Sequence, residues 1–174
     1  MGFRKLAVII LVLGCVLTAV GAAAARGQST PEERRLFVEL TALLEQKPLS
    51  DQAGNIRSYL FAWLSEVPDI AVVACMGPIT PIMEADYDQQ YAAALVIQPL
   101  FGQAAYLIGN PAVGGDSPAA QTAGIESMLR MYEFMLTQGV PRLSFLDDLL
   151  EKQQAGTLEQ WVGEQTASCK ASDS

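Results

Sequence analysis

The chain has 174 residues, of which 51% are hydrophobic, and its 19 acidic and 11 basic residues give a net charge of −8. This balance argues against binding to nucleic acid, or to an anionic membrane surface, through a basic patch. The sequence contains no histidine, which removes Ser-His-Asp and Cys-His catalytic arrangements and histidine-containing zinc sites.

The first 25 residues have the layout of a secretory signal peptide. Arg4 and Lys5 precede an uncharged run from Leu6 to Ala25 that ends in small residues. A basic start, an apolar middle and a small-residue end are typical of a cleaved signal, so we expect residues 1–25 to be removed. Two alternatives stay open: an uncleaved N-terminal anchor, since about 20 uncharged residues could span a bilayer, and lipidation at Cys15, whose preceding residues loosely resemble a bacterial lipobox.

Residues 26–174 are expected to form a single domain in the periplasm or outside the cell. Removing 25 of the 174 residues leaves 149, near the commonest domain size. Without Arg4 and Lys5 the basic residues number 9 against 19 acidic ones, and the net charge becomes −10. We expect a soluble acidic protein with no membrane contact after signal cleavage.

Two cysteines remain after Cys15 leaves with the signal, Cys75 and Cys169. An even number in an oxidising compartment predicts a structural disulfide between them. Closing a loop of about 95 residues would stabilise the fold by roughly 4–5 kcal/mol in the chain-entropy model. Two buried free thiols are the alternative, but Cys169 lies in a polar tail.

The first predicted helix begins at Thr30-Pro31-Glu32-Glu33, which combines a cap residue, proline at the first helical position and a capping-box glutamate. Leucines at helical spacing follow as far as Lys47-Pro48. A second apolar stripe, from Ile56 to Leu64, ends before Pro68. The short connection makes the two helices an antiparallel hairpin.

The apolar run from Ile70 to Met76 is interpreted as a short helix carrying Cys75, because the chain offers no convincing strand for it to pair with. A long segment from Tyr87 to Ile108 is apolar on more than one face, which is typical of a central helix. Pro99 is expected to kink or split it near Gln98.

Three further helices follow a loop that ends at Ser117. One begins at Ser117-Pro118, ends at Gly139 and carries Glu126 and Arg130 as an i, i+4 ion pair. The next ends at Gly156. The last begins at a capping box, Thr157-Leu158-Glu159-Gln160, and leads to Cys169.

The sequence therefore predicts an all-α fold: a compact irregular bundle of six or seven helices stapled by one disulfide. A tetratricopeptide-like array is a lesser alternative.

Carboxylates are the remaining candidates for chemistry. Glu84, Asp86 and Asp88 could supply oxygen ligands to calcium, but glycine and glutamate at EF-hand spacing are missing, and carboxylates that start a helix are the simpler interpretation. A second acidic patch, which could contain a glycosidase-type pair, is better interpreted as a solvated helix face with an Asp148–Lys152 ion pair. It consists of Asp147, Asp148, Glu151 and Lys152. No catalytic, cofactor or metal site is predicted.

Methionine and aromatic residues offer one possible ligand groove. They form the stripe from Ile125 to Leu136, with Met76 and Met83 elsewhere, and methionine adapts to irregular partners. Core packing would explain the same stripe.

Export, a stapled helical domain and the missing catalytic residues favour a non-catalytic protein that binds another protein. A carrier of a small molecule or lipid in an apolar cavity is the first alternative. A carboxylate-dependent hydrolase is the second.

Overall fold

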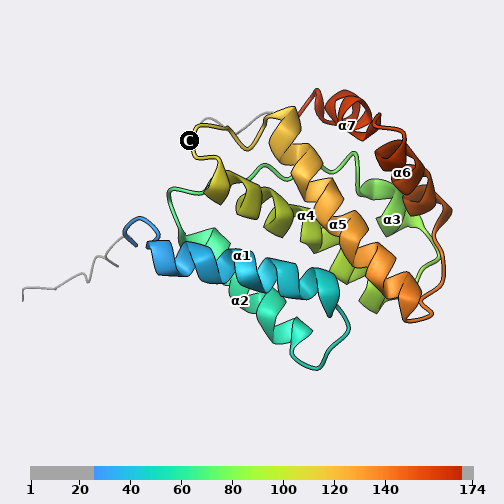
Figure 1. Cartoon of the computed structure of the whole chain (residues 1–174), viewed down its shortest axis with the longest axis horizontal. Coiled ribbons are helices and arrows are strands. Elements are labelled where there is room, and N and C mark those ends of the chain that lie inside the picture. Colours follow the sequence, from blue (N-terminus) through green and yellow to red (C-terminus); the bar gives the residue numbers. More distant parts are fainter. Residues whose placement is uncertain (1–25, 170–174) are drawn as a thin grey trace, which may run out of the picture.

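The computed structural model describes residues 26–169, which form seven α-helices and no strand (Figure 1). A disulfide joins Cys75 to Cys169, whose Cα atoms lie 5.8 Å apart. The predicted all-α bundle with one disulfide staple is confirmed. The predicted signal peptide over residues 1–25, the alternative anchor and the lipidation site at Cys15 lie outside the described residues.

Helices α1 (Pro31–Gln46) and α2 (Ala53–Glu66) form the predicted hairpin. Both halves of the capping box are present: the Thr30 hydroxyl accepts from the Glu33 backbone N–H, and the Glu33 carboxylate accepts from the Thr30 backbone N–H. These bonds satisfy two backbone donors that a helix start otherwise leaves free.

Helices α4 (Gln89–Gly109) and α5 (Pro118–Thr137) cross at the centre of the molecule (Figure 1). They approach closely because glycines stand at the crossing: a Cβ at Gly102 would lie 2.3 Å from the Ser127 Cβ, and one at Gly124 would lie 2.6 Å from the Pro99 carbonyl oxygen. Helix α4 runs without a break through Pro99, so the alternative of a split helix is wrong. The packing against α5 holds both sides of the proline in one helix.

The remaining helices are shorter. Helix α3 (Thr80–Glu84) precedes α4, and helices α6 (Ser144–Gln154) and α7 (Leu158–Thr166) pack against α5. Gly139 and Gly156 have φ values of +79° and +70°, the left-handed conformation that commonly ends a helix and that glycine adopts without steric cost.

Helix α4 is long and apolar enough to cross a membrane by length and composition alone. In the described bundle it contacts α1, α2, α3 and α5. Its core residues include Leu95, Phe101 and Ala104, all fully buried. It is the central core helix that the sequence predicts.

Three local predictions are wrong. The segment from Ile70 to Met76, predicted as a short helix, contains no helix. At α7, Thr157 makes no capping bond; its hydroxyl donates to the Lys152 carbonyl oxygen at 3.4 Å instead. Arg130 does not pair with Glu126, because it forms two hydrogen bonds of 2.8 Å with the Glu45 carboxylate of α1.

Candidate binding groove

An apolar groove of about 180 Å³ opens between the segment before α3 and helices α3, α4 and α5. Its lining is almost entirely hydrophobic, with two glutamines as the polar exceptions. The lining residues are Val73, Ala74, Cys75, Met76, Pro78, Ile79, Met83, Val96, Ile97, Pro99, Leu100, Gln103, Gln121 and Ile125.

Two methionines at this groove are exposed to solvent. Met76 is 49% exposed and Met83 is 56% exposed. Burying such side chains against a ligand would be favourable by about 25 cal/mol per Å² of apolar surface, and the flexible thioether fits irregular partners. The groove therefore has the chemistry of an apolar binding surface.

The structure brings together only part of the predicted methionine groove. Met76, Met83 and Ile125 do line one cavity. The methionines of α5, in contrast, are fully buried core residues: Met128, Met131 and Met135. Only the start of the α5 stripe reaches the groove, because the rest of that face packs inside the bundle.

Glutamine side chains hold the non-helical wall of the groove in place. The Val73 backbone N–H donates to Gln103 Oε1 at 2.6 Å, and the Val73 carbonyl accepts from Gln103 Nε2 at 3.4 Å and from Gln121 Nε2 at 3.0 Å. These amides replace the backbone partners that a helix or sheet would supply. The available sequence signal was Gln103, an amide among the mostly apolar residues of α4.

The disulfide anchors the other end of this wall. Cys75 is buried and is bonded to Cys169, just after α7. The chain beyond it also packs closely, since a Cβ at Gly77 would lie 2.9 Å from the Gln165 carbonyl oxygen. Disulfides of this kind persist in oxidising compartments.

Acidic residues follow Met83 directly along the chain. Glu84, Asp86 and Asp88 are all exposed, and the Asp88 carboxylate accepts from the Gln90 backbone N–H at 2.8 Å as the N-cap of α4. Among the described residues no group of three or more potential ligands is placed to hold a metal ion. None of the three carboxylates lines the groove, but Glu84 directly follows the lining residue Met83 in the chain.

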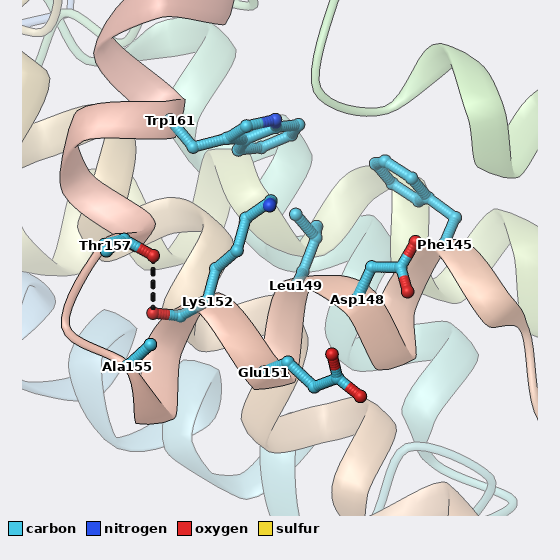
Figure 2. A pocket seen from close by; sticks show the side chains of 8 residues that line it. All are labelled: Phe145, Asp148, Leu149, Glu151, Lys152, Ala155, Thr157 and Trp161. Carbon is cyan, nitrogen blue, oxygen red and sulfur yellow. Dashed lines mark hydrogen bonds between the residues drawn. The ribbon is translucent and has the colours of Figure 1, made fainter.

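The second acidic patch lies elsewhere, at an open cleft of about 530 Å³ between α6 and α7 (Figure 2). Asp148, Glu151 and Lys152 line it from α6, and Figure 2 shows the Lys152 side chain extending towards Trp161 of α7. The predicted Asp148–Lys152 pair is not among the ion pairs of residues 26–169. Both cleft carboxylates belong to one helix.

Asp147 does not share this cleft. Its carboxylate accepts from the Tyr132 hydroxyl at 2.9 Å and from the Arg142 guanidinium at 2.9 and 3.0 Å. The Tyr132 hydroxyl also accepts from the Leu143 backbone N–H at 2.8 Å. Burial, together with the nearby Asp147 charge, raises the pKa of Tyr132 to about 12. Asp147 therefore joins the start of α6 to α5 and is not available as a partner for Asp148.

No family model matches the chain, and no curated protein or solved structure is significantly similar to it.

Proposed function

We propose that the chain is an exported, non-catalytic protein of the periplasm or extracellular space that binds another protein by taking an apolar side chain into the groove. The observation that carries this proposal is the pair of exposed methionines, Met76 and Met83, at a preformed apolar cavity. Export is supported by the signal-peptide layout of residues 1–25 and by the disulfide.

The size of the groove favours a protein partner over a carried lipid or small molecule. Pockets that enclose a drug-sized ligand measure roughly 300–1,000 Å³, whereas this groove measures about 180 Å³. Such a volume suits one or two side chains, while the rest of the ligand would stay outside. A protein segment has that shape, with an inserted side chain and a backbone that continues over the surface.

The α6–α7 cleft gives little support to a hydrolase. Glycoside hydrolysis needs two carboxyl groups on opposite sides of the scissile bond. The cleft carboxylates, Asp148 and Glu151, are three residues apart on α6. The lining residues across from them are Thr157, just before α7, and Trp161 of α7. Asp147 is already bonded to Tyr132 and Arg142.

Co-purification from the native cell envelope tests the proposal. Wild type is compared with Met83→Asp, which places a charge at the groove, and with Phe61→Asp, a matched control on α2 that is 51% exposed and does not line the groove. We expect a protein that is retained by wild type and by Phe61→Asp and lost by Met83→Asp. Retention by all three variants would contradict the proposal.

A further inference from the structure

One residue of the non-helical groove wall, Val73, is hydrogen-bonded in the way that a residue of a β-strand would be. One amide group, that of Gln103, bonds both the N–H and the C=O of Val73. Both groups therefore point to the same side of the chain, as they do for one residue of an extended strand, in which neighbouring residues point their backbone groups to the opposite side. The backbone groups of Val72 and Ala74 consequently face away from Gln103.

Among the described residues, that opposite edge has no hydrogen-bond partner. Within residues 26–169 no hydrogen bond reaches the backbone N–H or C=O of Val72 or Ala74. Ala74 is exposed and Val72 is half-buried, so both can be approached from solvent. The edge is also held in place at its two ends, by the disulfide at Cys75 and by the close approach of Gly115 to the Ala71 carbonyl oxygen.

We propose that the partner protein binds as an extended segment that pairs with the Val72–Ala74 edge as an added β-strand and inserts a large apolar side chain into the groove. This inference rests on the proposed function and specifies the partner's conformation. Strand addition uses backbone hydrogen bonds for affinity and side-chain pockets for specificity. The edge and the groove lie side by side, because Val73 to Met76 form one wall of the groove.

Two observations determine the chemistry of the partner segment. A helical ligand would satisfy its own backbone and leave the Val72 and Ala74 groups without partners, whereas an extended one would bond them. The exposed carboxylates that follow Met83, at Glu84, Asp86 and Asp88, complement basic side chains. The partner segment is therefore extended, with apolar side chains towards the groove and lysine or arginine between them.

The probe is a blocked peptide of seven residues in which lysine and leucine alternate, and its binding to the disulfide-bonded protein is measured by calorimetry. Two N-methylated forms carry the same side chains but remove backbone donors, one at the leucines and the other at the lysines. For a given strand direction, only one of these sets faces the protein edge. We expect one form to bind about tenfold more weakly or worse and the other to bind like the parent peptide.

Equal effects of the two N-methylated forms would overturn strand addition, as would absence of saturable binding of the parent peptide at ~1 mM. A matched peptide with glutamate in place of lysine tests the charge argument, and equal affinity would refute the basic partner. Ala74→Pro removes the backbone donor at this edge, whereas Phe61→Asp changes an exposed residue that does not line the groove, so we expect only the proline variant to weaken binding, by about tenfold. Circular dichroism melting confirms that both variants fold.

Failure of this inference can be told apart from failure of the proposed function. If Met83→Asp abolishes peptide binding while the two N-methylated forms bind equally, the groove binds proteins but strand addition is wrong. If the N-methylated forms differ while Met83→Asp binds normally, the edge is used but the groove is not. If the protein alone sediments as a dimer that Ala74→Pro dissociates, the edge pairs with a second copy and the proposed partner is wrong.

Discussion

Removal of the disulfide is the change whose energetic cost can be derived most directly from the structure. The bond joins residues separated by 94 positions, so the double variant Cys75→Ala/Cys169→Ala releases, in the unfolded state, a loop that covers about two thirds of residues 26–169. In the chain-entropy model a loop of this length is worth about 4–5 kcal/mol. For a domain of this size the loss corresponds to a fall in Tm of about 8–20 °C.

Urea unfolding followed by tryptophan fluorescence measures this loss, because Trp63 is buried in the core and will be exposed on unfolding. We expect reductant to lower the unfolding free energy of wild type by the same amount as the double substitution and to leave the variant unchanged. An unfolding free energy within about 1 kcal/mol of wild type for the variant, or no effect of reductant on wild type, would refute the disulfide and the stabilisation assigned to it.

Three other predictions concern the packing and the polar bonds of the bundle. Gly102→Ala should lower the free energy of unfolding by about 1–3 kcal/mol, because its Cβ would lie 2.3 Å from the Cβ of Ser127. The control Gly54→Ala should be neutral or slightly stabilising, because no atom lies within 4 Å of its added Cβ. Thermal melting of both variants measures the difference. Thr30→Ala should lower the free energy of unfolding by about 0.5–2 kcal/mol, because the helix cap is lost. Thermal melting measures this change, and equal Tm values for the variant and wild type would contradict the cap. The pKa of Tyr132 is raised in the folded state from an ordinary value near 10 to about 12, so its stabilising contribution is complete below pH 10 and is lost as the pH rises through 12. Urea unfolding from pH 8 to 12 should show this loss in wild type but not in Tyr132→Phe, and parallel pH profiles would contradict the shift.

Helices whose starts carry a local signal could be predicted from the sequence. Thr30-Pro31 and Ser117-Pro118 mark the starts of α1 and α5, and both cap residues make the expected bonds. The disulfide could also be predicted, because two cysteines allow only one pairing. These features depend on neighbouring residues or on simple counting.

The groove wall could not be predicted, because its conformation depends on distant partners. The run from Ile70 to Cys75 is apolar enough for a helix or a strand, and it is extended because Gln103 and Gln121, 30 and 48 positions from Val73, satisfy its backbone. The pattern of neighbouring residues in the sequence does not indicate bonds to such distant partners. The same reason explains Arg130, whose carboxylate partner comes from α1, 85 positions away, and not from its own helix.

The most direct test of the proposed function is a methyl NMR titration of the protein labelled at its methionines. Met76 and Met83 line the groove and are exposed, whereas Met128, Met131 and Met135 are buried in the core and serve as internal controls. On addition of the co-purifying partner, we predict that the methyl signals of Met76 and Met83 shift or broaden while those of the three α5 methionines keep their positions. Binding that leaves the Met76 and Met83 signals unchanged would contradict the account, because the partner would then occupy a surface other than the groove.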